Sequence, residues 1–389
     1  LKSKYILFAV FLLATAGVSA QKAERDYIRK GNRLFNDSVF VDAEVNYRKA
    51  LEANPKSTVS MYNLGNTLSQ QQKFQDAMEQ YVSASKIEKD KMKLAHIYHN
   101  MGVIFQAGKD YAKAVEWYRK SAEQGNAVAQ CQLGYMYKLG RGISQDYVKA
   151  VEWCRKSAEQ GYVYAQYDLG RMYEIGRGVW PNSAKAVEWY QKAAEQGNSK
   201  AQHTLGYMYE IGDGVSKDYA KAVEWYRKSA EQGYFYAQKD IGRMYEEGLG
   251  VSRDYAKAAE WYQKIAEMGD CFLQYKMGCM YEKGVGVPQD YAKAVEWYRK
   301  SAEQGLASAQ KDIGRMYEKG LGVSRDYAKA AKWYQKAISR GNTDAMCNLG
   351  YMYEYGLGVS KDNYIAAGLY FRAAKQGSLE AKKKWSSIH

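Results

Sequence analysis

Apolar residues recur along this chain with the period of an α-helix, in paired segments that are separated by glycines. Residues 198–233 show the arrangement. The apolar positions of the first segment follow the i, i+4, i+7, i+8 pattern of one helix face: Ala201, Leu205, Met208 and Tyr209. Those of the second segment form a similar stripe: Ala222, Tyr226 and Ala230. The pattern therefore predicts two amphipathic helices.

The ends of these two helices are marked by residue type. Gly212 and Gly214 follow the first helix, where the chain must turn through left-handed backbone conformations. Asp218 precedes the second helix, and its carboxylate can accept a free backbone N–H as an N-cap. The Gly-x-Gly pair lacks the preceding strand and the following lysine of a phosphate-binding loop. We therefore interpret it as a turn.

The two-helix unit repeats without an insertion. The N-cap position returns at every 36th residue: Asp110, Asp146, Asn182, Asp218, Asp254, Asp290, Asp326 and Asp362. Seven whole units fill residues 126–377. Since neither helix can bury its apolar face alone, the units must stack on one another. The sequence predicts an all-α fold made of helix–turn–helix repeats.

One glycine stands in the middle of the first helix of every unit. The series is Gly134, Gly170, Gly206, Gly242, Gly278, Gly314 and Gly350. A glycine inside a helix costs about 1 kcal/mol relative to alanine. Its presence in all seven units predicts that a neighbouring helix passes too close for a side chain.

The ends of the chain differ from the seven units. Upstream, glycines and tyrosines recur at spacings of 34 and then 37 residues: Gly31, Gly65 and Gly102, with Tyr47, Tyr81 and Tyr118. Downstream, residues 378–389 begin another first helix that three lysines make polar, as expected for a terminal cap. We divide the chain into residues 1–20, 21–125, 126–377 and 378–389.

The first twenty residues have the layout of a secretory signal peptide. Lys2 and Lys4 precede an apolar run from Tyr5 to Ala16, and Ser19-Ala20 ends in small residues. The alternative is an uncleaved membrane anchor, but the run is shorter than the ~20 residues that a span needs. We expect no transmembrane segment in the mature chain and a periplasmic or secreted location.

Charge and chemistry narrow the function. The net charge of +14 favours anionic partners, although the basic residues are spread through every unit, as on a solvated helix surface. Export argues against nucleic acid as a partner. Five cysteines do not share one repeat position, and we expect mainly free thiols; Cys131 and Cys154 form the one pair that could meet.

No catalytic motif is recognisable. HExxH, GxSxG and P-loop patterns are absent from the sequence, and His96 and His99 lack a third ligand at a fitting spacing. We expect no enzyme, no metal and no cofactor. Three Asp–Arg pairs at i, i+3 predict helix salt bridges: Asp168–Arg171, Asp240–Arg243 and Asp312–Arg315.

The 36-residue pattern A-x-x-x-L-G-x-M-Y-x-x-G-x-G-V-x-x-D-Y-x-K-A-x-x-W-Y closely resembles the SEL-one-like repeat (SLR) family over about two thirds of the chain. Residues 201–233 show it almost unbroken. The upstream units resemble tetratricopeptide repeats (TPR), and residues 21–111 are similar to TPR proteins of bacterial aerotolerance operons. The resemblance implies a right-handed α-solenoid, or superhelix, and a scaffold that assembles protein complexes. Some secreted, cysteine-rich SLR proteins are β-lactamase-like, which gives a hydrolase of envelope material as the alternative function.

The same resemblance implies where a ligand binds, because TPR ligands lie along the first helices. Counted from the mid-helix glycine, the equivalent positions in the first unit are 128, 131, 135 and 139. They vary between units and carry the candidate groove residues: Tyr164, Tyr167, Arg171, His203, Tyr207, Tyr236, Arg243, Tyr275, Arg315 and Tyr351. Tyrosine and arginine are enriched in binding hot spots; the alternative is drift on a solvated face.

The groove residues also suggest the ligand. Tyrosines interleaved with arginines outside the repeat core lead us to expect a protein or peptide, with an acidic segment or an anionic envelope glycan preferred. In the TPR-like segment, four asparagines fall near positions that hold peptide backbones in the family: Asn32, Asn63, Asn66 and Asn100. Ile28 and Asn100 replace basic residues of the carboxylate-clamp subtype, so capture of a C-terminal carboxylate is not expected.

Signal-peptide cleavage is directly testable. We predict that the chain is cut after Ala20, because small residues end the segment behind a short apolar run. N-terminal sequencing of the protein from its native host should return a chain that begins at Gln21. A mature protein that keeps Tyr5–Ala16 would contradict the prediction.

Overall fold

A computed structural model describes residues 2–388, with the backbone alone for residues 2–18 and for residue 388. In that part of the chain every regular element is a helix, which confirms the all-α solenoid class. The expected signal segment falls largely outside the residues whose side chains are described. Within the described residues, no helix combines the length and the apolar character needed to cross a membrane.

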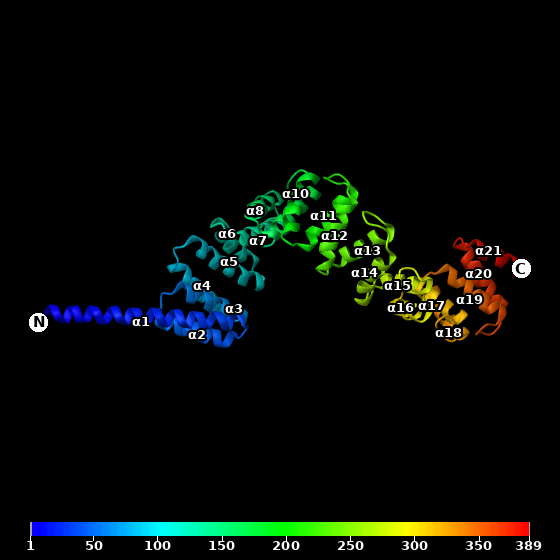
Figure 1. Cartoon of the computed structure of the whole chain (residues 1–389), viewed down its shortest axis with the longest axis horizontal. Helices are drawn as coiled ribbons and strands as arrows, with labels where there is room; N and C mark the ends of the chain where they lie inside the picture. The colour runs from blue at the N-terminus through cyan, green and yellow to red at the C-terminus, as the bar shows by residue number, and fades with distance from the viewer. Residues whose placement is uncertain (1, 389) are drawn as a thin grey trace. The chain divides into compact units, whose positions relative to one another are not determined.

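The chain forms two compact units, residues 1–198 and 199–389. The helices of the first unit are α1 (Lys2–Asn36), α2 (Phe40–Ala53), α3 (Thr58–Gln70), α4 (Phe74–Ile87), α5 (Lys91–Ala107), α6 (Tyr111–Glu123), α7 (Ala127–Leu139), α8 (Tyr147–Glu159), α9 (Val163–Ile175) and α10 (Ser183–Glu195). Within it, helices that follow one another in sequence pack as neighbours (Figure 1).

The second unit has the same construction. Its helices are α11 (Ser199–Ile211), α12 (Tyr219–Glu231), α13 (Phe235–Glu247), α14 (Tyr255–Glu267), α15 (Cys271–Lys283), α16 (Tyr291–Glu303), α17 (Ala307–Lys319), α18 (Tyr327–Ser339), α19 (Thr343–Tyr355), α20 (Asn363–Lys375) and α21 (Leu379–Ile388). In both units odd-numbered helices are the first, and even-numbered helices the second, of a pair.

The mid-helix glycines lie where the two helices of a pair touch. A Cβ atom on Gly242 would come within 2.5 Å of the Tyr262 ring, and one on Gly206 within 2.8 Å of the Tyr226 ring. Every described first helix that carries such a glycine meets a tyrosine in this way, except α7, where Gly134 faces the Cys154 sulfur. The predicted close approach is confirmed, and its cause is a buried aromatic ring.

The predicted turn chemistry is also confirmed. Gly140 ends α7 with a left-handed φ of 66°. Gly142, two residues later, has a φ of 68°, and a Cβ there would lie 2.2 Å from the backbone of Tyr111 in the preceding repeat. The second glycine therefore serves both the turn and the stacking of repeats. Asp218 and Asn182 cap their helices through side-chain hydrogen bonds, as expected.

A buried glutamine connects successive repeats. Gln130 donates to the carbonyl of Ala122 in the preceding repeat, at 3.1 Å, and accepts from Gln160 at the end of its own repeat, at 2.7 Å. The second bond recurs in three later repeats: Gln196 to Gln166, Gln232 to Gln202 and Gln304 to Gln274. Each glutamine thereby fastens one repeat to the one before it.

Two repeats lack the donor of this second bond. Met268 and Arg340 occupy the position that glutamine holds elsewhere. Correspondingly, Gln238 and Gln310 each have a buried Oε1 atom with no hydrogen-bond partner among the described residues. A buried acceptor left without a donor lowers stability.

Replacing Met268 by glutamine should therefore stabilise the protein. The side chain is 67% exposed, so little packing is lost, and the new amide can donate to Gln238. We expect a gain of about 1 kcal/mol in the free energy of unfolding, measured by urea denaturation. The reciprocal control is Gln196→Met, which should lower stability by removing the donor to Gln166. An unchanged Met268→Gln variant beside a destabilised control would contradict the prediction.

Candidate functional site

In the first unit, cavities lie at the positions equivalent to the candidate groove. One of them measures about 340 Å³ and lies between α3 and α5. Its wall consists of Thr58, Val59, Tyr62, Glu88, Lys93, His96 and Ile97. Val59 and Tyr62 stand six and three residues before Gly65, and His96 stands six before Gly102. This is the register that the sequence assigned to the groove of later repeats.

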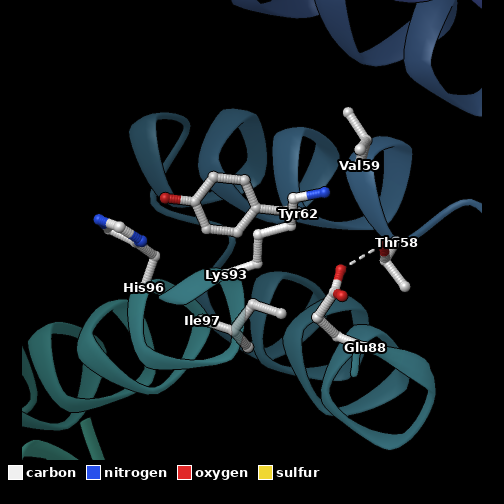
Figure 2. A pocket seen from close by; sticks show the side chains of 7 residues that line it. All are labelled: Thr58, Val59, Tyr62, Glu88, Lys93, His96 and Ile97. Atoms are coloured by element: carbon white, nitrogen blue, oxygen red, sulfur yellow. Dashed lines mark hydrogen bonds between the residues drawn. The ribbon is translucent and has the colours of Figure 1, made fainter. Parts of the chain in front are cut away.

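The cavity is apolar with charged groups at its edge. Figure 2 shows Val59 and the Tyr62 ring on α3 opposite His96 and Ile97 on α5. Glu88 is held in place because its carboxylate accepts a hydrogen bond of 2.6 Å from the Thr58 hydroxyl. That hydrogen bond also lowers the pKa of Glu88, against the smaller opposite effect of burial. The site can enclose one apolar side chain of a ligand.

Two smaller cavities measure about 270 Å³ each; residues of α1, α2 and α3 line one, and residues of α1, α3, α4 and α5 line the other. Asparagines line both of them. The Oδ1 atom of Asn32 accepts from Tyr47 and Asn63, and the Oδ1 atom of Asn66 accepts from Tyr81 and Asn100. Such contacts fix the amide planes, and the Nδ2 groups of Asn32 and Asn66 have no partner among the described residues. Oriented amides of this kind can bond a peptide backbone.

His99 is half-buried. Its ring packs on Tyr118, with the ring centroids 5.7 Å apart, and burial lowers its pKa to about 4. The side chain is therefore neutral near pH 7. Within the described residues no group of three or more His, Cys, Asp and Glu side chains is arranged to hold a metal ion.

The candidate groove residues of the first unit behave differently from one another. Tyr164 is 60% exposed, whereas Tyr167 packs on Tyr190 with 5.6 Å between the ring centroids. The salt bridge expected between Asp168 and Arg171 is wrong. Asp168 instead pairs with Lys138 of the preceding repeat, at 3.4 Å, and the exposed Arg171 has no carboxylate partner among the described residues.

In the second unit, Arg243 is enclosed by carboxylates. Its guanidinium makes two hydrogen bonds, of 2.8 and 2.9 Å, to Glu210 of the preceding repeat. Asp240 and Glu247 lie at 3.5 and 3.6 Å, so the expected Asp240–Arg243 pair is confirmed. Asp240 also bonds His203, at 2.9 Å. His203 and Arg243 are therefore joined through one carboxylate.

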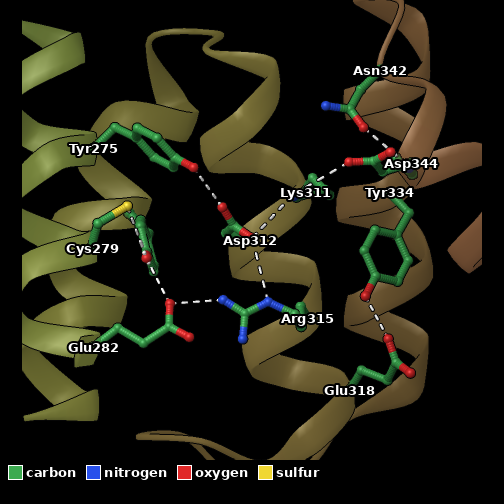
Figure 3. Close-up of polar contacts among 12 residues, drawn as sticks. Tyr275, Cys279, Glu282, Lys311, Asp312, Arg315, Glu318, Tyr334, Asn342 and Asp344 are labelled. Atoms are coloured by element: carbon green, nitrogen blue, oxygen red, sulfur yellow. Dashed lines mark hydrogen bonds and ion pairs between the residues drawn. The ribbon is translucent and has the colours of Figure 1, made fainter.

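The same network returns two repeats later. Figure 3 shows Arg315 between Glu282 and Asp312, and Tyr275 donating to Asp312. The Arg315–Glu282 distance is 2.7 Å and the Arg315–Asp312 distance 3.3 Å, which confirms the third expected salt bridge. Tyr275 thus takes the place of His203.

These contacts change the role expected for the arginines. The glutamate that binds each arginine from the preceding repeat also accepts a hydrogen bond from the core tyrosine of its own repeat. Tyr226 donates to Glu210 and Tyr298 donates to Glu282, both at 2.7 Å. Arg243 and Arg315 therefore tie neighbouring repeats together, so substituting them should alter stability as well as any binding. The sequence could not reveal this, because the glutamate partner lies 33 residues away in the chain.

The exposed groove tyrosines remain available as contacts. Tyr207 is 49% and Tyr236 is 58% exposed, although the Tyr236 ring lies 6.2 Å from that of His203. Tyr351 is 39% exposed and stacks on Tyr355, at 4.6 Å between centroids. A cavity of about 270 Å³ also lies beside Arg243, between α13 and α15. The structure therefore places these residues on a surface without defining one ligand site among them.

All five cysteines are free thiols. Cys131 and Cys154 are buried; burial raises the pKa of Cys131 to about 12 and that of Cys154 well above the ordinary value for a thiol. Neither thiol is thereby activated as a nucleophile.

Comparisons with known proteins agree with this repeat architecture. The family model for the Sel1 repeat matches residues 92–126, 127–162, 163–198, 199–234, 235–270, 273–306, 307–342 and 343–378. The chain belongs to the Sel1 repeat family. A tetratricopeptide repeat model matches residues 46–79, so this Sel1 repeat protein also carries a TPR at its N-terminal end. The first Sel1 match, residues 92–126, covers the C-terminal part of the 21–125 range of the TPR-like segment and ends one residue beyond it.

Two solved structures resemble the whole Sel1 array. One is c5321, a protective antigen present in uropathogenic Escherichia coli strains that displays an SLR fold. It is 31% identical over 97% of this chain and 90% of that chain, with a TM-score of 0.61. The other is a Sel1 repeat protein from Oxalobacter formigenes, 32% identical over 80% of this chain and 91% of that chain, with a TM-score of 0.56. None of the curated proteins matches significantly. Sel1 and TPR arrays are typically non-catalytic interaction scaffolds that bind proteins or peptides.

The carboxylate network predicts a pH-dependent contribution to stability. Burial alone would raise the pKa of Glu282, but the hydrogen bonds from Arg315 and Tyr298 outweigh it, and the pKa lies below its ordinary value. A lowered folded-state pKa stabilises the protein above the unfolded-state pKa, and this contribution is lost as the pH falls through the folded-state value.

Glu282→Gln should therefore lower the free energy of unfolding by about 1–3 kcal/mol at pH 7. The difference from the wild type should shrink as the pH drops below about 4. Denaturation curves at a series of pH values measure both effects. Glu296→Gln, on the exposed face of α16, is the matched control and should change little. An equal loss at pH 7 and pH 3 would contradict the ionic explanation.

Proposed function

We propose that this Sel1 repeat protein is a non-enzymatic scaffold that binds an extended segment of a partner protein along α1, α3 and α5. The observation that carries the proposal is a set of three cavities on these helices: the apolar one lies beside the N-terminal halves of α3 and α5, and the two asparagine-lined ones lie beside and beyond the mid-helix glycines. A peptide in extended conformation presents alternate side chains and backbone amides. The apolar cavity suits a side chain, and the asparagine-lined cavities suit the backbone.

The apolar cavity favours a medium-sized hydrophobic anchor. Its volume of about 340 Å³ lies at the lower end of ligand pockets, enough for one aliphatic or aromatic side chain. The Lys93 ammonium and the Glu88 carboxylate stand on its rim. An uncharged residue at the anchor position, with polar neighbours, therefore fits best.

Fewer arginines can bind an acidic residue of the partner than the sequence suggested. Arg243 and Arg315 already share carboxylates of their own chain. Arg171 does not, because Lys138 stands where Glu210 and Glu282 stand in later repeats. We propose Arg171, beside the exposed Tyr164, as the position where an acidic group of a partner is recognised.

We also propose that the scaffold acts after export, in the periplasm or outside the cell. The proposal rests on the signal-peptide layout of residues 1–20. Downstream of Ala20, α1 contacts the rest of the fold through Glu24, whose carboxylate accepts a 2.9 Å hydrogen bond from Asn54, and through Tyr27, Gly31 and Asn32.

The cavity between α3 and α5 can be tested by cross-linking and substitution. A photo-reactive amino acid in place of Val59 should capture a partner protein in the native host. The same amino acid in place of Val41, an exposed valine of α2, should not. Peptides from the captured protein then serve as ligands for titration.

With such a peptide, Val59→Asp should weaken binding at least tenfold, because a charge enters an apolar pocket; this equals about 1.4 kcal/mol. Val59 is 42% exposed, so the fold should tolerate the change. Val41→Asp, at a valine that is 66% exposed, is the matched control and should bind like the wild type. Equal affinity of all three proteins would place the binding surface elsewhere.

A further inference from the structure

The exposed face of α20 differs from that of every second helix in the seven preceding repeats. Those helices carry lysine at the position of Ile365, and arginine or glutamine at that of Phe371. Six of them carry glutamate, and one lysine, at the position of Gly368. Tyr364 replaces alanine or valine. One helix has therefore exchanged a charged surface for an apolar one.

The exchanged residues form one exposed patch. Tyr364, Gly368 and Phe371 follow at i, i+4 and i+7, so they lie on the same side of the helix, with Ile365 next to them. Tyr364 is 89%, Phe371 49% and Ile365 40% exposed. The Phe371 ring packs on Trp385 of α21, with 5.4 Å between centroids, and still keeps half of its surface in solvent. We call these four α20 residues the α20 patch.

Gly368 is the informative member of this patch. A glycine inside a helix lowers stability by about 1 kcal/mol relative to alanine. The mid-helix glycines of the first helices compensate by receiving a tyrosine ring, or the Cys154 sulfur, within 3 Å of the missing Cβ. Around Gly368 no described heavy atom lies within 4 Å of that point. The space left by the missing Cβ atom of Gly368 is therefore not filled by any described part of the same chain.

We infer that the α20 patch binds a second copy of this chain, with Tyr364 of each copy seated on Gly368 of the other. A two-fold interface requires that one surface supply both partners of each contact. The α20 patch meets this requirement, since ring and gap stand one helical turn apart. The contact reproduces between two molecules the ring-on-glycine packing that joins the helices within each repeat.

An antiparallel pairing of the two α20 helices satisfies the other residues of the patch. The register that sets Tyr364 on Gly368 also brings Lys361 of one copy opposite Phe371 of the other. Lysine over an aromatic ring is a contact this chain uses repeatedly, as in Lys120 and Trp117, at 4.1 Å. In the same register the basic C-terminal end of each helix, with Arg372 and Lys375, lies toward the N-terminal end of the other helix. There the Asp362 carboxylate can pair with one of these cations.

The size of the α20 patch determines how tightly two copies are expected to bind. Three exposed apolar side chains on each copy correspond to a small interface, which supports a weak and concentration-dependent dimer. The proposal is independent of the peptide groove in the first unit, because no residue is shared between the two.

The decisive measurement is the mass of the purified protein by sedimentation velocity over a wide concentration range. The wild type should shift from monomer to dimer as the concentration rises. A variant that restores the residues of α6 (Tyr364→Ala, Ile365→Lys, Gly368→Glu and Phe371→Arg) should stay monomeric at every concentration. Its helicity should be unchanged, because α6 already folds with these residues.

A single substitution distinguishes specific dimerisation through the α20 patch from non-specific hydrophobic association. Gly368→Leu adds apolar surface and improves helix propensity, yet it fills the gap that receives Tyr364. Specific pairing predicts that this variant dimerises at least tenfold more weakly, whereas non-specific association would become stronger. Glu296→Leu, at the equivalent position of α16, is the control and should leave dimerisation unchanged.

Three results would overturn the proposal: a wild type that is monomeric throughout, a restored variant that dimerises equally, or a Gly368→Leu variant that dimerises more tightly. Vesicles of phosphatidylglycerol provide the remaining comparison, since Lys382, Lys383 and Lys384 lie nearby in sequence. Patch-dependent binding to these vesicles without dimerisation would assign the α20 patch to an anionic membrane surface instead.

Discussion

Close contact between a tyrosine ring and a helix-interior glycine sets the geometry of each helix pair. The ring leaves no room for a Cβ atom on the first helix, so the pair can approach only where glycine stands. Its phenolic hydroxyl then emerges beyond the glycine and donates to a polar side chain of the first helix. In α3 the acceptor is Asn66, and in α11 it is Glu210. The packing contact thereby decides where polar groups lie on the first helix.

Further contacts in the second unit depend on that hydrogen bond. Glu210 and Glu282 are oriented by their tyrosines and are therefore positioned to receive Arg243 and Arg315 from the next repeat. One repeat that lacks the tyrosine supports the view that the salt bridges depend on this hydrogen bond. In the repeat of α7 and α8, Cys154 replaces the tyrosine and Lys138 replaces the glutamate. The arginine of the following repeat, Arg171, accordingly has no carboxylate partner among the described residues.

The first helices of the second unit consequently differ in their binding properties from α1, α3 and α5. In the second unit, cations and carboxylates largely neutralise one another, and removing them from water for a ligand would cost part of the free energy they now contribute. Along α1, α3 and α5, asparagine amides stand near the mid-helix glycines, and Val59 and Tyr62 line the apolar cavity. Uncharged groups are cheaper to desolvate. This difference is the physical reason for assigning the peptide site to the N-terminal repeats.

The local construction of a repeat array also explains how α20 can differ. Each repeat contacts only its neighbours, so one surface can change while the remaining repeats keep their packing. Buried positions of α20 retain the pattern, since Ala366, Tyr370 and Ala373 are as fully buried as their equivalents. Leu369 replaces the tryptophan of the second helices in the seven preceding repeats and is itself buried. The exchange of charged for apolar residues falls on exposed positions, which points to a surface contact and not to relaxation of the core.

The sequence alone determined the helices, their caps, the 36-residue repeat and the close approach at the glycines. These features depend on residues near one another in the chain or on a fixed period. The sequence also named a set of first-helix positions as candidate binding residues in the later repeats, and this assignment stays a prediction. It did not assign Val59, Tyr62 and His96 to a cavity, although their distance from Gly65 and Gly102 would have identified them. Only the tertiary structure decided that Arg243 and Arg315 are bound by glutamates of the preceding repeat while Arg171 is exposed. Which carboxylate reaches which guanidinium depends on how adjacent repeats stack, and no local pattern records that geometry.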